Sequence, residues 1–429
     1  MIRAEDYAAL PYWACDAALP AADQGPPPVD VDVAIVGAGY TGLAAARATA
    51  EAGRRTLVLD AGPIGGGCSS RNGGQVTFGI KPAHATLAAC HGEAVANRIY
   101  AEALEAVASL KALVRDERID CDWRDVGGFV GAHTRRHYAA LIREAASEPE
   151  GLGVPFEVVP EARLREAIDS PLYCGGVLYP DDAAVHPLKL VAALASRARA
   201  AGAALCAPCA VHSLGRTPAG FELATAAGPV RARQVLIATN GYTGALSPWH
   251  RRRILPIGSY ILATEPLERA RVERLIPHGR NVGDTRRVVV YLRPSPDGCR
   301  ILFGGRASAA ETDVGRCLER LRAMLAQVFP ELAQVRVSRA WMGFVGYTFD
   351  TMPHLGEQDG LYYCMGYCGR GIASATYYGR KIGLRMVGRP GGETALAGLE
   401  FPTRPYYAGR PWFLPAAVLG VRLADLCGL

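Results

Sequence analysis

Three glycines and one aspartate stand at spacings suited to binding a dinucleotide. Gly37, Gly39 and Gly42 form the pattern Gly-x-Gly-x-x-Gly, and Asp60 follows farther along the chain. In such a pattern the first glycine allows a tight turn, the second lets the backbone approach a pyrophosphate, and the third lets a helix pack on a strand. A carboxylate at the position of Asp60 accepts hydrogen bonds from a ribose. We therefore predict that these four residues bind an adenine dinucleotide.

The elements around this pattern are those that a dinucleotide site needs. Residues 31–36 are a β-branched run typical of a strand buried in a parallel sheet, and residues 56–60 form a second such strand. Between them lies an alanine-rich helix over residues 43–52, which ends before Gly53. Free N–H groups at the start of this helix would face the phosphates. The alternative is a glycine-rich turn that binds nothing, but this alternative does not explain why all the parts of a βαβ unit are present.

A second glycine-rich loop, residues 62–75, favours a flavin over a nicotinamide. A nicotinamide site does not need such a loop, whereas a flavin lying against backbone does, and no second Gly-x-Gly-x-x-Gly unit is present. The predicted cofactor is FAD. Besides the four residues above, the contacts expected from this part of the chain are Tyr40, Thr41, Ala61, Gly67, Cys68, Ser69, Arg71, Asn72, Gly73, Gly74 and Gln75.

Two later segments should complete the flavin site. Strand-like runs at 204–214, 221–226 and 230–233 form a meander that leads into a buried strand over 234–240. Near the C-terminus, a strand over 361–365 enters a glycine turn and then a helix over 372–386, whose positive N-terminal end suits a flavin carbonyl that becomes anionic on reduction. The contacts expected here are Val211, Asn240, Gly241, Gly369, Arg370, Gly371 and Ile372.

The remaining segments predict a second domain. A long amphipathic helix over 91–118 is followed later by strands at 254–263, 287–292, 299–303 and 335–347, which suggest an antiparallel sheet. The expected fold class is α/β: a Rossmann-like, doubly wound FAD-binding domain with an inserted α+β substrate domain. The FAD-binding domain would comprise residues 1–82, 186–247 and 346–390, the substrate domain 83–185 and 248–345, and a C-terminal tail 391–429.

Composition narrows the class of protein further. The net charge is only +6 and no basic run is dense enough for nucleic acid, so no nucleic-acid partner is expected. Twelve scattered cysteines indicate reduced thiols and a cytoplasmic location. Cys206 and Cys209 have the spacing of a metal or redox pair, but no second pair stands nearby, and we predict no metal site. The apolar C-terminal segment is short and interrupted, so no transmembrane span is expected.

These motifs together resemble the glycine and D-amino-acid oxidase family of FAD enzymes. The stretches that carry the likeness are 33–42 with Asp60, 70–75 (Ser-Arg-Asn-Gly-Gly-Gln), 255–266, 341–343, 350–353 and 366–371. Segments 71–75 and 256–260 are most similar to the gamma-glutamylputrescine oxidoreductase branch. The resemblance implies oxidation of a C–N bond by FAD, giving an imine that hydrolyses to a carbonyl compound and an amine.

Two departures from that family bear on the cofactor and the electron acceptor. Sarcosine oxidases of the family tether the flavin through a cysteine just before a Tyr-Thr pair, whereas here Gly346 precedes Tyr347-Thr348. FAD is therefore expected to be bound without a covalent bond. Some relatives activate oxygen with a lysine over the flavin, and Lys81 is the lysine expected nearby.

The substrate end of the site should need few catalytic groups, because a neutral amine gives hydride to the flavin once its C–H bond is positioned. For a substrate anion the best partner is an arginine, and Arg306 is the candidate clamp, with Arg370 beside the flavin. Tyr260 and Tyr347 are candidates for an aromatic wall or a hydrogen-bond donor, although strand aromatics are often core residues. Trp341 and His354 are more readily explained as structural.

Three functions therefore remain in view from the sequence. The first is an oxidase that takes a small-molecule amine or amino acid and passes electrons to molecular oxygen. The second is an amine dehydrogenase that passes electrons to a quinone or a carrier protein. The third is a flavoprotein subunit or sensor that binds FAD without turnover.

Overall fold

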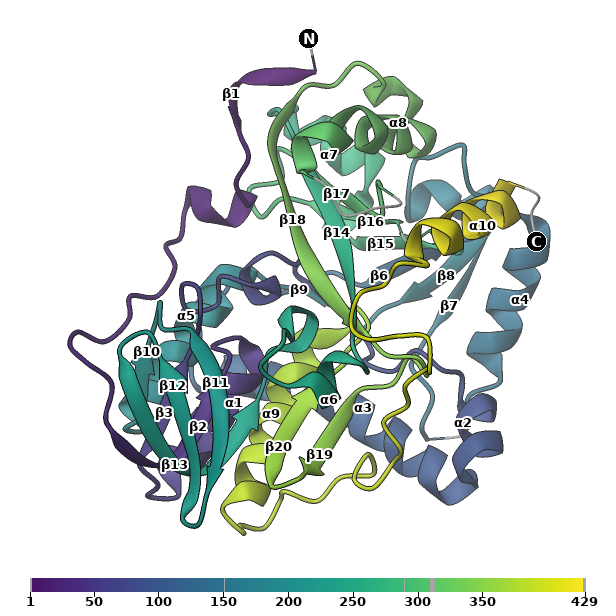
Figure 1. Cartoon of the computed structure of the whole chain (residues 1–429). Coiled ribbons are helices and arrows are strands. Elements are labelled where there is room, and N and C mark those ends of the chain that lie inside the picture. Colours follow the sequence, from purple (N-terminus) through teal and green to yellow (C-terminus); the bar gives the residue numbers. More distant parts are fainter. Residues whose placement is uncertain (1, 150, 289, 309–312, 427–429) are drawn as a thin grey trace.

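A computed structural model describes residues 2–149, 151–288, 290–308 and 313–426. Two large β-sheets dominate it (Figure 1). Each sheet has its own hydrophobic core. The first sheet contains the strands that flank the glycine pattern. The second contains most of the antiparallel strands predicted for the substrate domain.

The first sheet has a parallel centre. Its strands run in the order β10-β3-β2-β13, with β20 also paired to β13. Their bounds are β2 Asp30–Val36, β3 Thr56–Leu59, β10 Ala204–Cys206, β13 Gly228–Ile237 and β20 Leu361–Met365. An antiparallel meander of β11 (Val211–Thr217) and β12 (Gly220–Thr225) continues from β13, and β19 (His354–Gln358) pairs with β20.

Alternation along β2 explains why both faces of this sheet are covered. Val33 and Ile35 belong to the core under the helices, whereas Ala34 and Val36 belong to the core under the meander. The helices of the first core are α1 (Tyr40–Glu51), α3 (Glu93–Asp116), α5 (Pro187–Ala200) and α9 (Gly371–Met386). The core on the meander side of the sheet is covered by strands, by Trp249 of α6 (Pro248–Arg251) and by Phe401 of the tail.

Helices α1 and α9 pack closely because α9 carries glycines where they meet. A Cβ atom on Gly379 would lie 2.5 Å from the Thr41 carbonyl oxygen, and one on Gly383 would lie 2.8 Å from that of Ala45. This contact joins the helix that follows the glycine pattern to the helix that follows the C-terminal glycine turn. It brings the N-terminal ends of both helices to the same region of the molecule.

The second sheet has the strand order β1-β18-β14-β17-β16-β15-β6-β8-β7. The bounds are β1 Arg3–Ala8, β6 Gly128–Gly131, β7 Glu157–Pro160, β8 Gly175–Tyr179, β14 Leu255–Thr264, β15 Asn281–Asp284, β16 Val290–Pro294, β17 Ile301–Gly305 and β18 Val337–Tyr347. Helices α7 (Arg269–Leu275) and α8 (Leu318–Val328) cover one face. A three-stranded sheet of β4 (Gln75–Val76), β9 (Ala183–Ala184) and β5 (Arg124–Asp125) completes the strands.

One feature differs from the arrangement expected along the chain. Strand β1 pairs with β18 at the edge of the second sheet, although the proposed boundary placed residues 1–82 in the FAD-binding domain. The tail, in turn, ends in helix α10 (Leu414–Leu426), which lies near β6 and β15 in Figure 1. The remaining helices are α2 (His84–His91) and α4 (Arg135–Ala146).

Candidate active site

A cavity of about 1260 Å³ is lined by residues of both sheets. This exceeds the volume of a usual small-ligand pocket, roughly 300–1,000 Å³. Its wall includes the glycine pattern, the 62–75 loop, the start of α9 and the inner face of the second sheet. The cavity therefore has room for a dinucleotide together with a small substrate.

The glycine pattern forms one end of the cavity. Gly37 has φ +112°, and a Cβ atom there would lie 2.7 Å from the Ala238 carbonyl oxygen. A Cβ atom on Gly39 would lie 2.8 Å from Ser69 Oγ, which accepts a hydrogen bond from the Tyr40 amide at the start of α1. Gly39 therefore leaves the N-terminus of α1 open toward the cavity, as pyrophosphate binding requires.

Asp60 follows β3 and is fixed by two backbone amides. Its Oδ2 accepts from Ala38 N at 2.7 Å, and its Oδ1 accepts from Gly62 N at 2.9 Å. Burial raises the pKa of this carboxyl, while both hydrogen bonds act in the opposite direction. The carboxylate is thus held at the cavity wall in one orientation, which suits an acceptor for ribose hydroxyls.

The 62–75 loop is held by its own side chains and by tryptophans from elsewhere. Asn72 Oδ1 accepts from Gly74 N, and its Nδ2 donates to the carbonyl oxygens of Cys68 and Ser69. Trp341 Nε1 donates to the Arg71 carbonyl oxygen, and Trp13 Nε1 donates to that of Asn72. Because these hydrogen bonds fix the conformation of the loop, its backbone forms a rigid wall of the cavity.

The substrate domain also anchors this loop directly. Arg293 of β16 is 2% exposed, and its Nη1 donates to the carbonyl oxygens of Gly74 at 2.9 Å and Val185 at 3.0 Å. Gln75 Nε2 donates to the Leu292 carbonyl oxygen at 2.9 Å. Consecutive residues of β16 therefore hold the end of the loop.

The C-terminal glycine turn supplies another wall. Cys368 and Gly369 have φ values of +52° and +90°, and α9 starts at Gly371. Arg370 points back to the segment after the 62–75 loop, where its Nη1 donates to the carbonyl oxygens of Ile80 and Phe78. The turn and this segment are thereby held together at the cavity.

Polar side chains of the second sheet face the same cavity. Arg306 is 8% exposed, and its Nη1 donates to the Gly258 carbonyl oxygen at 2.8 Å. Tyr291 and Ser259 share a hydrogen bond of 2.9 Å. Tyr347, at the end of β18, also lines the cavity, and Lys81 Nζ donates to its Oη at 2.9 Å and lies 4.7 Å from the centroid of its ring.

The model of the FAD dependent oxidoreductase (DAO) family matches residues 32–383, most of the chain. The chain belongs to this family. FAD is therefore its cofactor, and the protein is an oxidoreductase that acts on amines or amino acids. The arrangement of Gly39, Asp60 and the start of α1 fits such a cofactor.

Relatives and solved structures agree with the family assignment. The chain is 30% identical to gamma-glutamylputrescine oxidoreductase of Escherichia coli (strain K12), with 93% of each chain covered. It is 29% identical to the probable oxidoreductase OrdL of Haemophilus influenzae, with 88% of each covered. Glycine oxidase from Geobacillus kaustophilus shares the fold with a TM-score of 0.73 and 23% identity, covering 88% of this chain and all of that one.

The fold also matches L-proline dehydrogenase from P. horikoshii, with a TM-score of 0.71 and 19% identity over 91% of this chain and 99% of that one. The solved structures confirm the predicted fold class. The family model and the E. coli relative confirm the FAD-dependent amine or amino-acid chemistry. Within the part of the chain that the structure describes, no helix has both the length and the apolar character needed to cross a membrane.

Most residues predicted to contact FAD in this oxidoreductase line the cavity. They are Gly37, Gly39, Tyr40, Thr41, Asp60, Ala61, Gly67, Cys68, Ser69, Arg71, Asn72, Gly73, Gln75, Val211, Asn240, Gly369, Arg370, Gly371 and Ile372. Three predicted glycines, Gly42, Gly74 and Gly241, are absent from its wall. A Cβ atom on Gly42 would lie 1.9 Å from the Gly37 carbonyl oxygen, so this glycine serves helix–strand packing.

Of the three residues predicted to contact the substrate, two line the cavity and one does not. Arg306 and Tyr347 line the cavity, but Tyr260 is fully buried in the core between the second sheet and α8. Its neighbour Ser259 faces the cavity, and side chains alternate along a strand. Trp341 supports the 62–75 loop, and His354 Nε2 bonds to Asp350, so both have structural partners as expected.

Several cavity residues were missed because nothing local marks them. Ser259 and Tyr291 lie within strands that read as ordinary sheet. Asn281 begins β15, where no strand was predicted, and Asp182 lies in the turn before β9. Only the pairing of distant strands brings these side chains to the cofactor cavity.

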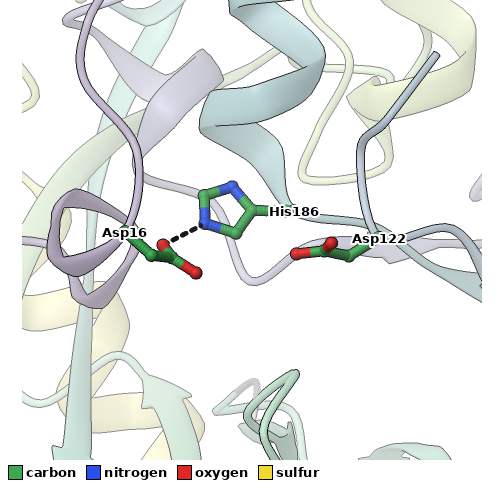
Figure 2. Close-up of side chains that lie close together, drawn as sticks. All are labelled: Asp16, Asp122 and His186. Carbon is green, nitrogen blue, oxygen red and sulfur yellow. Dashed lines mark hydrogen bonds and ion pairs between the residues drawn. The ribbon is translucent and has the colours of Figure 1, made fainter.

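One cluster outside the cavity has the residue types of a metal centre. Asp16, Asp122 and His186 place their ligand atoms within 4.8 Å of one another (Figure 2). His186 Nδ1 accepts from the Lys189 amide as the N-cap of α5, so its Nε2 carries the proton donated to Asp16 at 2.9 Å. Lys189 Nζ lies 2.7 Å from Asp122 Oδ1, so the ammonium group supplies the positive charge that a metal ion would otherwise bring to this cluster. The cluster therefore joins the N-terminal segment to α5.

Proposed function

We propose that this chain oxidises the C–N bond of a small amine or amino acid that carries an anionic group, and that Arg306 binds that group. The observation that carries the proposal is the position of Arg306, a nearly buried guanidinium on the wall of the FAD cavity. A planar guanidinium on the cavity wall can bind a carboxylate through two parallel hydrogen bonds. The hydrogen bond to Gly258 fixes the orientation of the fork.

The chain's own groups would position the substrate, since bound FAD supplies the hydride acceptor. Arg306 would fix the anionic end, and the apolar part of the second sheet would exclude water. The E. coli relative is named for gamma-glutamylputrescine. This name supports an amine substrate that also bears a carboxylate.

We propose molecular oxygen as the electron acceptor. Support comes from Lys81, whose ammonium group lies on the cavity wall and is oriented by Tyr347. A positive charge there would stabilise negative charge that develops on oxygen during its reduction. A quinone or carrier protein is the alternative acceptor.

We also propose a cytoplasmic location. The described cysteines are free thiols, which supports a reducing, cytoplasmic setting.

The substrate proposal is tested with amines that differ only in a carboxylate. Arg306→Ala should raise KM at least tenfold for the carboxylated amine and leave its FAD content unchanged. Arg306→Lys should recover part of the loss, because a point charge lacks the fork. Arg320→Ala is the matched control, since exposed Arg320 donates to the neighbouring Ala307 carbonyl oxygen away from the cavity. An unchanged kcat/KM in Arg306→Ala would refute the clamp.

A further inference from the structure

Three carboxylates are among the described residues of the cavity wall: Asp60, Asp182 and Asp284. Asp60 is held by the amides at the dinucleotide end. Asp284 pairs with Arg286 and accepts from Tyr173 Oη at 3.2 Å. Asp182 is different, because it reaches the wall from the turn between β8 and β9 and forms no ion pair with any residue that the structure describes. Its role is not explained by the cofactor or by the fold.

The Asp182 carboxylate lies directly over the start of β6. A Cβ atom on Gly128 would stand only 2.0 Å from Asp182 Oδ2, so a glycine is required below it. Gly128 pairs in parallel register with Asn281 of β15. Since paired residues of neighbouring strands place their side chains on the same face, the Asn281 side chain and the Asp182 carboxylate lie on the same side of the sheet.

Asn281 shows a second, independent feature. It is 3% exposed and lines the cavity, and its Nδ2 donates to the Ala183 carbonyl oxygen at 2.8 Å. Its Oδ1 is buried and has no hydrogen-bond partner among the described residues. A buried acceptor without a donor costs free energy, so this atom indicates a ligand that donates hydrogen bonds.

Both features point to the same ligand chemistry. A carboxylate and an amide oxygen are acceptors only, and an alkylammonium group has three donors and one positive charge. We propose that Asp182 and Asn281 form a subsite for a positively charged nitrogen of the substrate, separate from the nitrogen that is oxidised. The inference deepens the proposed function, on which it rests, and the substrate class becomes amines with a second cationic nitrogen.

The subsite should depend on pH. The pKa of Asp182 is raised to about 7, mainly by burial and also by the charge of Asp181, although the charge of Arg370 acts to lower it. The nearby phenol of Tyr179 does not titrate in this range, since burial raises its pKa to about 12. Asp182 is therefore ionised above about pH 7 and loses its charge below it. Binding of a cation should weaken as the pH falls through this range.

The test compares 1,4-diaminobutane with n-butylamine as probes. Both are titrated into the FAD-loaded protein without oxygen, and binding is followed by the shift in the flavin absorption spectrum. The wild-type protein should prefer the diamine by about tenfold or more at pH 8, as expected for one charge-assisted hydrogen bond. Asp182→Asn should remove most of this preference. Asp181→Asn, the same change at the exposed neighbour, should keep it.

Two further measurements keep the test decisive if Asp182→Asn fails to load FAD. Gly128→Ala retains the carboxylate but displaces it, and should also lower the preference. In the wild type, the preference should decline between pH 8 and pH 6, while both probes stay protonated because alkylammonium pKa values lie near about 10. A wild type without diamine preference, or a preference that is independent of pH and of Asp182, would overturn the subsite.

Failure of the subsite and failure of the proposed function give different results. If amines bleach the flavin but diamines gain nothing from Asp182, the subsite is wrong and the function stands. If diamines bind through Asp182 but no amine reduces the flavin, the subsite stands and the function is wrong.

Discussion

The Arg293 guanidinium and the Gly74 carbonyl oxygen are joined by a 2.9 Å hydrogen bond that crosses from the second sheet to the cofactor loop. The same nitrogen also bonds to Val185, and burial lowers the pKa of Arg293 to about 9. A buried charge is expensive unless it is well bonded. Its bonds here go to backbone oxygens, so they fix the course of the loop. The substrate domain thus shapes the wall that receives FAD.

This relationship predicts that Arg293→Met loosens the loop. FAD affinity should fall at least tenfold, with a lower unfolding temperature in the FAD-free protein, because the Val185 carbonyl oxygen loses this donor and the Gly74 carbonyl oxygen keeps only the Val185 amide. Both are measured by flavin fluorescence on dilution and by thermal unfolding. Arg269→Met is a suitable control, since exposed Arg269 donates to the Asp297 carbonyl oxygen on the outside of the same domain. Equal FAD affinity in Arg293→Met and wild type would contradict the prediction.

The dinucleotide end should be sensitive to a side chain at Gly39. Gly39→Val would place atoms against Ser69 and in the space before α1, so FAD binding should be lost. Gly215→Val, on an edge strand where the nearest atom is 4.0 Å from the new Cβ, should bind FAD normally. Stoichiometric FAD in purified Gly39→Val would show that the glycine pattern is not a binding site.

Asp60→Ala should have a milder effect on the same cofactor. Removing the acceptor should weaken FAD binding by about 1–3 kcal/mol, while the protein still folds. Titration of the FAD-free variant with FAD measures this difference. An affinity equal to that of the wild type would exclude a ribose contact at Asp60.

The way in which FAD is attached can be tested by denaturation. Gly346 stands just before Tyr347, where a tethering cysteine would be expected, and burial raises the pKa of the cavity thiols of Cys68 and Cys368. Acid precipitation should therefore release all the FAD into the supernatant. Flavin that stays with the precipitated protein would show a covalent bond.

The sequence predicted much of the nucleotide domain because its signals are local. Strand β20 lies where the apolar run predicted it, and α9 begins within one residue of the predicted helix. Helix α1 starts earlier than predicted, at Tyr40, because its first turn is formed by the glycine pattern itself. The helix predicted over 91–118 is α3, and a separate α2 precedes it across Gly92, whose φ is +86°.

The residues on the substrate side of the cavity could not be predicted as well from local sequence patterns. Both faces of β14 are buried, so alternation alone could not show that Tyr260 faces the core and Ser259 the cavity. Strand segments expected at 230–233 and 234–240 are one strand, β13, which pairs first with β12 and then with β2. The pairing of β6 with β15 brings Asp182 and Asn281 to the same side of the sheet, and no short sequence pattern records that pairing.

If molecular oxygen is the electron acceptor, replacement of Lys81 should slow reoxidation of the reduced flavin. Lys81→Met should leave reduction of the flavin by amines intact and slow its reoxidation by air at least tenfold, because the positive charge on the cavity wall is lost. Stopped-flow mixing of the reduced protein with oxygen measures this rate. Lys111→Met removes an exposed lysine that pairs with Asp125, and should behave like the wild type. Equal reoxidation rates in all three proteins would exclude the role of Lys81.

The central claim is that this FAD-dependent protein oxidises amines, and anaerobic titration of the FAD-loaded protein tests it most directly. A panel of secondary amines, polyamine conjugates and amino acids is added while the absorption of oxidised flavin is followed. At least one amine should bleach the flavin completely in stoichiometric amount, and an aldehyde or keto product should be recovered. Bound FAD that no amine in the panel reduces would contradict the claim.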